Sequence, residues 1–449
     1  MRGVLRLGLW AISTAFIVNN MAAQEPLTLR NAIALALKEN PDAAVARAGC
    51  DEAAAGAAMA RTQLLPQVSF LEDMSRGNDP VYVFGTKLRQ GRFTQADFSL
   101  PALNRPDAIG NFASRFSGQW MAFDFFRMQK LIASADRMKE SAALQAKAVD
   151  QKIVFDVVQA YQGVLYAERQ VEVAQHEMET AQALLSSVDD RVKAGLAVES
   201  DRMSAQVNEA AVKQALIAAQ GGLDLSWAQL RVATGSPTLA QSKLAPLEPR
   251  DFADIPLDQA LQTAAKTRPD FAAVGQAREA QAAAASAARL SYAPHIGAYG
   301  QWEDNHGWGG PGGNNWVAGV QIGIDLLPFS KRAQVAQARV VEARAAAQTN
   351  HYEQQVRLQV TQAHIQRQTA KLSVETAKTA VDQATESLRI LRNRYGAGLA
   401  TMTDLLRGED AERQAQENYW RAVYGNSVAY AQVLFATGTL TPDAAEGLQ

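Results

Sequence analysis

Cysteine is nearly absent from this chain of 449 residues, in which Cys50 is the only one. A single thiol cannot form an intramolecular disulfide, so a disulfide framework is excluded. Cys50 lies between Gly49 and Asp51, well beyond the first segment of the chain, so we do not expect it to carry a lipid anchor. We expect it to be a small residue on one face of a helix.

Long apolar runs are also scarce. Hydrophobic residues make up 47% of the chain, yet after the first segment no run approaches the roughly 18 apolar residues that a membrane-spanning helix needs. The formal net charge of -2 provides no strongly basic face for nucleic acid. With only 15 prolines and abundant alanine, the composition favours long helices.

Motifs for catalysis are missing as well. The five histidines show no spacing that is typical of metal ligands. There is no nucleophile elbow and no phosphate-binding loop, because the glycine-rich stretch Gly309–Gly313 is not followed by a helical pattern. The sequence therefore predicts no enzyme activity, no catalytic or cofactor-binding residues, no bound metal and no cofactor.

The first segment has the features of a secretory signal. Arg2 and Arg6 precede an apolar stretch over residues 7–18, and small residues follow up to Ala23. A buried first helix is the alternative, but Asn19 and Asn20 interrupt its pattern. We expect a signal peptide over residues 1–23 and export of the remaining chain.

Several landmarks recur in the same order in the two halves of the chain. LTLRNAIALALKENPD (27–42) matches IPLDQALQTAAKTRPD (255–270), and RVKAGLAVESD (191–201) matches RYGAGLATMTD (394–404). Internal similarity of this kind predicts a tandem structural repeat. We expect a first repeat over 24–235, a proline-rich linker over 236–256, a second repeat over 257–438 and a C-terminal tail over 439–449.

Each half contains a stretch in which the hydrophobic period changes to two, as in β-strands. These stretches predict strand pairs over about 66–125 and about 294–327, each with an apolar, aromatic face and a face of amides and hydroxyls. Asp304–Gly313 is rich in glycine and predicts a loop within the second pair. The segment Leu71–Asn111 is longer than its counterpart and predicts an extended loop.

Very long helical patterns follow the strands. Residues 127–194 and 331–394 would each form a helix of about 100 Å at 1.5 Å per residue. Apolar residues within them step alternately by three and four, which predicts coiled-coil seams. The seam residues are Val171, Ala174, Met178, Ala181, Leu185, Val188 and Val192, then Val374, Ala377, Val381, Ala384, Leu388, Leu391 and Tyr395. Return helices are expected over 201–234 and 402–437.

The strand pattern leaves two readings open. Alternating faces bordered by aromatic residues match a membrane β-barrel with a polar lumen, but four strands are too few, because the smallest closed barrels have about eight. Either several copies assemble into one barrel, or the strands form a half-buried sheet of a soluble domain.

Taken together, these features resemble the TolC-like family of outer-membrane efflux proteins over nearly all of residues 27–438. The matching pieces are LTLRNAIALALKENP, the strands that begin at prolines, the long helices and the two AGLA turns. The resemblance implies an α+β membrane protein with an internal two-fold repeat. In it, a homotrimer with four strands per chain builds a 12-stranded β-barrel in outer-membrane lipid, continuous with a periplasmic coiled-coil barrel.

The resemblance also implies partners and a location. The expected partners are two further copies of the chain, a periplasmic adaptor (membrane fusion protein) and an inner-membrane transporter of the RND, ABC or MFS type, with no nucleic acid. The protein would lie in the bacterial outer membrane, without a lipid anchor, and would extend far into the periplasm. The long segment Leu71–Asn111 would then be extracellular.

The two AGLA turns are the candidate functional site. Gly195 and Gly398 suit the left-handed conformation that ends a helix, and Ser200 or Thr403 suits the cap of the next helix. Helix capping alone explains those residues. It does not explain two exposed leucines, so the adaptor-docking candidates are Gly195, Leu196, Gly398 and Leu399.

The resemblance also implies a gate at these tips. The position of Tyr395 would contact that of Asp201, and the position of Asp404 would form a constricting acidic ring; acids in a first helical turn are also favoured by the helix dipole alone. Two residues depart from the family pattern: Ala400 replaces an arginine, and Arg407 replaces a second acid. The gate candidates are Asp201, Tyr395, Asp404 and Arg407, and we expect a tip that opens easily and is only weakly cation-selective.

The sequence therefore predicts a passive exit duct of a tripartite efflux or type I secretion system. The alternative from another class is a secreted or periplasmic coiled-coil scaffold without a pore. The exported substrate, whether drugs, metals or polypeptides, is left open.

Overall fold

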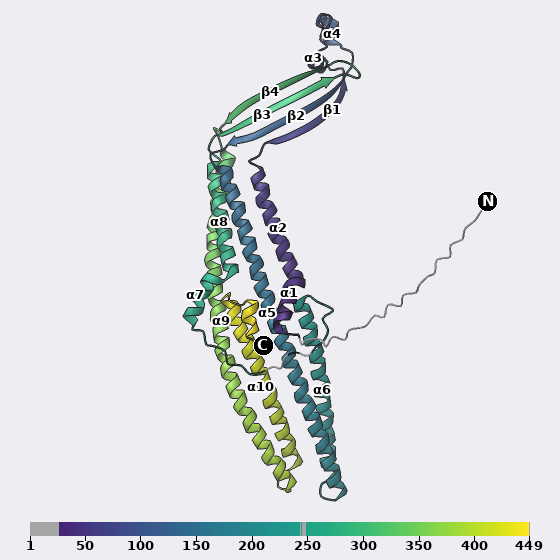
Figure 1. Cartoon of the computed structure of the whole chain (residues 1–449), viewed down its shortest axis with the longest axis vertical. Coiled ribbons are helices and arrows are strands. Elements are labelled where there is room, and N and C mark those ends of the chain that lie inside the picture. The colour runs from purple at the N-terminus through teal and green to yellow at the C-terminus, as the bar shows by residue number, and fades with distance from the viewer. Residues whose placement is uncertain (1–26, 243, 245–247, 449) are drawn as a thin grey trace, which may run out of the picture.

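The protein is an elongated molecule with a β-sheet at one end and two helical hairpins that end together at the other (Figure 1). A computed structural model describes residues 27–242, 244 and 248–448. The expected signal peptide, residues 1–23, lies outside the described residues.

Four antiparallel strands form the sheet, in the order β1-β2-β3-β4. They are β1 (Gln67–Gly77), β2 (Ile109–Phe123), β3 (His295–His306) and β4 (Gly312–Gly323). Two expectations were wrong. β1 continues well past Leu71, and β3 and β4 pair as far as His306 and Gly312, so the loop predicted over Asp304–Gly313 shrinks to residues 307–311. Cross-strand pairing outweighed the local turn signals there.

The two faces of the sheet differ in chemistry. Phe70, Phe116, Trp302 and Trp316 are register partners across all four strands and form one aromatic row. Each of these side chains is more than 40% exposed, whereas a soluble sheet would bury them. The opposite face carries polar side chains, among them Arg115 and Glu303, whose Nε and Oε2 atoms are 3.0 Å apart.

Two long helical hairpins descend from the sheet. The first consists of α5 (Arg127–Lys193) and α6 (Glu199–Thr234), and the second of α9 (Phe329–Gly396) and α10 (Met402–Ala436). α5 has 67 residues and α9 has 68, so each is about 100 Å long. The seam residues are buried or half-buried along both helices. Within the part of the chain that the structure describes, no helix combines the length and the apolar character that crossing a membrane requires.

Shorter helices repeat the same plan in each half. α1 (Leu29–Glu39) leads into α2 (Pro41–Thr62), and α7 (Leu257–Thr267) leads into α8 (Pro269–Leu290). Each break falls before a proline, as expected from the restricted backbone of the residue that precedes it. The first amide of α2 is capped by Asn40, whose Oδ1 accepts from the Asp42 N–H at 2.8 Å.

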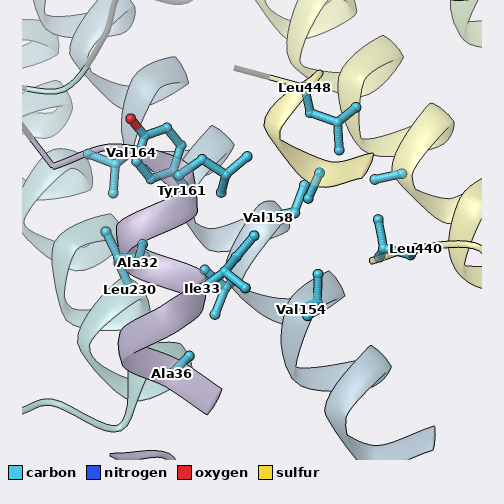
Figure 2. Close-up of a cluster of buried hydrophobic side chains, with 14 of the residues drawn as sticks. Ala32, Ile33, Ala36, Val154, Val158, Tyr161, Val164, Leu230, Leu440 and Leu448 are labelled. Atoms are coloured by element: carbon cyan, nitrogen blue, oxygen red, sulfur yellow. The ribbon is translucent and has the colours of Figure 1, made fainter. Parts of the chain in front are cut away.

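The main core lies about halfway along the molecule, where α1 and the C-terminus meet α5 (Figure 1), and Figure 2 shows its side chains. Ile33 of α1, Val158 and Tyr161 of α5 and Leu230 of α6 are buried together there. The segment expected to be a C-terminal tail contributes to this core through Leu440 and Leu448 and contains α11 (Pro442–Glu446). The Nε2 of Gln162 donates to the Leu448 carbonyl at 2.8 Å, which fixes the tail to α5.

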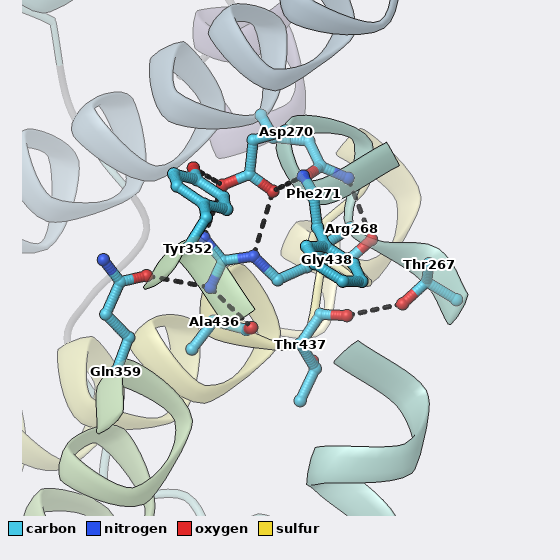
Figure 3. A network of polar contacts seen from close by, with 10 residues as sticks. Thr267, Arg268, Asp270, Phe271, Tyr352, Gln359, Ala436, Thr437 and Gly438 are labelled. Carbon is cyan, nitrogen blue, oxygen red and sulfur yellow. Dashed lines mark hydrogen bonds and ion pairs between the residues drawn. The ribbon is translucent and has the colours of Figure 1, made fainter. Parts of the chain in front are cut away.

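In the second half of the chain, the buried Arg268 connects α8, α9 and α10 (Figure 3). Nη1 of Arg268 donates to Gln359 Oε1 at 2.9 Å and to the Ala436 carbonyl at 3.2 Å, and its Nε donates to Asp270. The Tyr352 hydroxyl donates to Asp270 at 2.8 Å. Burial, followed by this hydrogen bond, raises the pKa of Tyr352 to about 12, so the tyrosine stays protonated.

The segment between β1 and β2 was expected to be an extended loop, and this was wrong. It folds into α3 (Pro80–Arg89), the 3-10 helix η1 (Gln95–Phe98) and α4 (Leu100–Asn104). We call residues 78–108 the insertion. It stands at the end of the sheet that is farthest from the hairpin tips (Figure 1).

Candidate functional site

Both hairpins turn through the same hydrogen-bonded motif. Gly195 has φ +71° and Gly398 has φ +73°, the left-handed conformation that glycine adopts without strain. The next amide closes each turn: Leu196 N–H donates to the Arg191 carbonyl and Leu399 N–H to the Arg394 carbonyl, both at 2.8 Å. This is the Schellman ending of a helix.

The turns leave two leucines in solvent. Leu196 is 72% exposed and Leu399 is 69% exposed. The turn hydrogen bonds use only the backbone of these residues, so the folding of the turn does not account for a large apolar side chain at either position. The two hairpins thus present matching exposed apolar points at the same end of the molecule.

The expected helix caps were wrong. α6 begins at Glu199 after Val198, and α10 begins at Met402 after Thr401, so Ser200 and Thr403 lie inside the first helical turns. Thr401 forms a capping box with Asp404: the Asp404 N–H donates to Thr401 Oγ1 at 3.1 Å, and the Thr401 N–H donates to Asp404 Oδ2 at 3.1 Å. The Thr-x-x-Asp spacing was readable in the sequence.

The carboxylate of Asp404 is therefore hydrogen-bonded at the start of its own helix, α10. The hydrogen bonds from Thr401 lower the pKa of the Asp404 carboxyl, and the charges of Arg407 and Arg394 add smaller effects. Among the described residues no ion pair within 4.0 Å joins Arg407 to Asp404, so Arg407 acts on this carboxylate at longer range.

Tyr395 is half-buried where the two hairpins meet. The guanidinium of Arg191, on α5, lies 5.0 Å from the centroid of the Tyr395 ring, on α9. Burial raises the pKa of the Tyr395 hydroxyl, the charge of Asp201 raises it further and Arg191 opposes the rise. In the part of the chain described here, no hydrogen bond joins this hydroxyl to Asp201; the three groups interact through charge and stacking.

An apolar cluster supports this contact. Val188, Ala205, Leu388, Met402 and Leu405 are buried together, so all four long helices contribute to it. The sequence did not single out Arg191 for this place. Its counterpart Arg394 instead donates from Nη2 to the Leu399 carbonyl at 3.3 Å, within its own turn. The two repeats have therefore diverged at this position.

A charged cluster lies farther up the hairpins and was missed in the sequence. Arg413, on α10, is paired with Asp410, with Glu417 at 2.8 Å and with Glu177 of α5 at 3.5 Å. Burial, opposed by Arg413 and reinforced by the carboxylates of Glu417, Glu412 and Asp410, raises the pKa of Glu177 to about 8. These residues face each other only when the hairpins pack, which a single sequence does not show.

Comparisons with known proteins agree on one family. A family model described as outer membrane efflux protein matches residues 32–236 and 260–439. The alkaline protease secretion protein AprF of Pseudomonas aeruginosa is 24% identical over 351 residues, which cover 74% of this chain and 70% of AprF.

Solved structures share the fold over almost the whole chain. The CmeC outer membrane channel of Campylobacter jejuni superimposes with a TM-score of 0.79 at 16% identity, over 92% of this chain and 85% of CmeC. The MtrE outer membrane channel of Neisseria gonorrhoeae, solved in its open state, gives a TM-score of 0.75 at 18% identity, over 92% of this chain and 91% of MtrE.

Proposed function

The chain belongs to the outer membrane efflux protein family, and from this premise we propose that three copies form one duct through the outer membrane and the periplasm. The protein is an outer-membrane exit channel of a tripartite efflux or secretion system. The family assignment favours this duct over a coiled-coil scaffold without a pore.

The proposal of a trimer rests on the open sheet, whose two edge strands lack a partner within the described residues. Within the described residues β1 pairs only with β2, and β4 pairs only with β3, so each sheet has two unpaired edges. Exposed edges are unfavourable unless another strand covers them. β4 of one copy beside β1 of the next would close three sheets into a 12-stranded barrel, with the row from Phe70 to Trp316 facing lipid.

The hairpin tips would then gather at the periplasmic end. We propose that Arg191, Tyr395 and Asp201 hold the hairpins together in the closed duct, and that Asp404 lines its narrowest part. Leu196 and Leu399 are the proposed contacts for a periplasmic adaptor, which would connect the duct to an inner-membrane transporter of the RND, ABC or MFS type. Exposed leucines at a turn suit a partner that binds by apolar burial.

The cargo could be small molecules, as in an efflux system, or polypeptides, as in a secretion system. The polypeptide cargo is favoured by the similarity to AprF, whose name assigns that protein to the secretion of alkaline protease. A duct that is lined by the protein itself and driven by its partners has little need of a specific substrate pocket, so both cargo classes fit the same channel.

Mass and conductance measurements test the proposed assembly. Protein purified in detergent should have three times the 48.5 kDa mass of one chain, after correction for the cleaved signal. The same trimers should form discrete conducting channels in planar lipid bilayers. A monomer in detergent that yields no channels would overturn the proposal.

A further inference from the structure

The insertion between β1 and β2 lies against the polar face of the sheet. The hydroxyl of Tyr82, on α3, is 2.9 Å from Ser75 Oγ, and Nε2 of Gln90 donates to Asn111 Oδ1 at 2.8 Å. Ser75 and Asn111 are each five residues from a member of the aromatic row, so both lie on the opposite face. α3 therefore packs on the face that a closed barrel turns inward.

A buried chain of amides fixes the insertion in this place. Gln90 donates to Asn111, Asn111 Nδ2 donates to Asn305 Oδ1 at 2.9 Å, and Asn305 Nδ2 donates to Glu303 Oε1 at 2.8 Å. All four residues are at most 6% exposed. Moving α3 away would break the bond from Gln90 to Asn111 and leave a buried amide oxygen without its donor, which is unfavourable.

The backbone at the end of α3 also lies very close to the backbone of β4. A Cβ atom added to Gly313 of β4 would lie 2.5 Å from the Arg89 carbonyl oxygen, so only glycine lets the end of α3 rest on the strand. Leaving out a side chain at this position brings two backbones together.

The insertion is also ordered within itself. Phe93 packs edge-on against both Phe84 and Phe98, with ring centroids 4.8 and 5.1 Å away. Lys87 Nζ lies 2.7 Å from Asp97 Oδ1. This hydrogen bond, with others from Thr94, lowers the pKa of Asp97 to about 2. These contacts make the insertion a small folded unit rather than a flexible loop.

Two arginines of this unit, Arg89 and Arg92, are exposed to solvent. Arg89 is 61% exposed and lies 3.9 Å from Glu303, a carboxylate that is already bound by Arg115. Arg92 donates to Gln90 Oε1 at 3.3 Å, a neutral partner. Since Lys87 and Asp97 neutralise each other, positive charge dominates this end of α3.

We propose that the insertion is a fixed constriction at the outer mouth of the channel, and that Arg89 and Arg92 make this mouth favour anionic solutes. The proposal rests on the trimeric barrel proposed above. Three insertions on the inner face narrow the opening, and two arginines from each copy form a ring of positive charge. A charged ring at a narrow point controls which ions pass.

Reversal potentials in a KCl gradient across planar bilayers test the charge. Arg89→Glu combined with Arg92→Glu should lower the chloride-to-potassium permeability ratio by about threefold or more. Arg76→Glu is the matched control, because Arg76 lies at the same end of β1 but shares a face with Phe70. This control should leave the ratio unchanged.

The constriction itself is tested by Gln90→Ala, which removes the anchor but keeps the rest of the insertion. Its single-channel conductance should rise, or its open-channel noise should increase, relative to wild type. Wild-type trimers that conduct, with variants that match them in conductance and selectivity, would overturn the constriction and leave the duct standing. Wild-type protein that forms no channel would overturn both proposals.

Discussion

The guanidinium of Arg191 lies over the ring of Tyr395, 5.0 Å from its centroid, and so joins the first hairpin to the second close to the tips. The two residues come from different repeats, and Tyr395 packs against the apolar cluster that all four long helices share. The contact connects α5 directly to α9 at this end of the molecule. Its strength should therefore influence how readily the tips separate.

Loss of the stacked pair should make the tip open more often. We expect Arg191→Ala and Tyr395→Leu to raise the open probability in bilayer recordings by about two- to fivefold, because a partly exposed cation–π contact is worth about 0.5–1 kcal/mol. Tyr395→Phe keeps the ring and should stay close to wild type. Arg394→Ala is the control, since Arg394 serves its own turn. Equal effects of the two arginine variants would contradict the prediction.

The hairpin tip should select only weakly for cations, because Asp404 is engaged by Thr401 and lies near the positive charge of Arg407. Asp404→Ala should therefore change cation selectivity little. It should weaken the start of α10, because Asp404 is the N3 partner of the capping box. Arg407→Ala should increase cation selectivity. Strong cation selectivity in the wild-type channel, measured by reversal potential, would count against this account.

The hairpin contact at Glu177 should depend on pH. Burial raises the pKa of this carboxyl from the 4.5 that is usual for a glutamate to about 8 in the folded protein, so the folded state holds an extra proton between these values. This contribution to stability is complete below about pH 4.5 and is lost as the pH rises through about 8. The melting temperature in detergent should therefore fall over this range.

Substituting Glu177 separates its contribution to the pH dependence of the melting temperature from the contributions of other titratable groups. Glu177→Gln should flatten the dependence of the melting temperature on pH and stabilise the protein at pH 8, by an amount on the order of 1 kcal/mol. Glu375→Gln, at an exposed position on α9, is the matched control and should leave the pH profile intact. A Glu177→Gln profile that overlays the wild-type profile would show that this carboxyl is not responsible.

Gly438 should tolerate no side chain. Its φ is +72°, and an added Cβ would lie 2.8 Å from the Cα of Arg268. Gly438→Ala therefore combines backbone strain with a collision between backbones, and we expect a loss of at least about 2 kcal/mol in thermal unfolding. Gly195→Ala isolates the strain, because φ is +71° there and the space is open. It should cost about 1 kcal/mol.

What the sequence could foretell depends on how far apart the interacting residues lie. The turns at Gly195 and Gly398 were predictable because a left-handed helix end is a local event with a local signature. The seams were predictable because their period repeats along one helix. The hydrogen bond between Asn111 and Asn305 was not, because 194 residues separate these amides and only the pairing of β2 with β3 brings them together.

The insertion shows the same limit. Its extra length relative to the second half predicted a loop, whereas its fold depends on contacts within the insertion and on those of Gln90 and Tyr82 with the sheet. The error at the start of α10 has another cause, because the sequence offers two threonines that could cap this helix. Thr401, which forms the capping box with Asp404, is the one that caps it, and the prediction chose Thr403.

The exposed leucines should be required for binding the adaptor but not for folding. Leu196→Asp combined with Leu399→Asp places a charge where apolar burial is expected, and a desolvated, unpaired carboxylate opposes association. We expect the variant to form normal trimers and channels and to lose most of its co-purification with a periplasmic adaptor. Leu225→Asp makes the same change at a residue that is 61% exposed on α6. It lies roughly 40 Å from the tip along the helix, so it should bind the adaptor normally. Retention of the adaptor by the double variant, or its loss from both variants, would place the docking surface elsewhere.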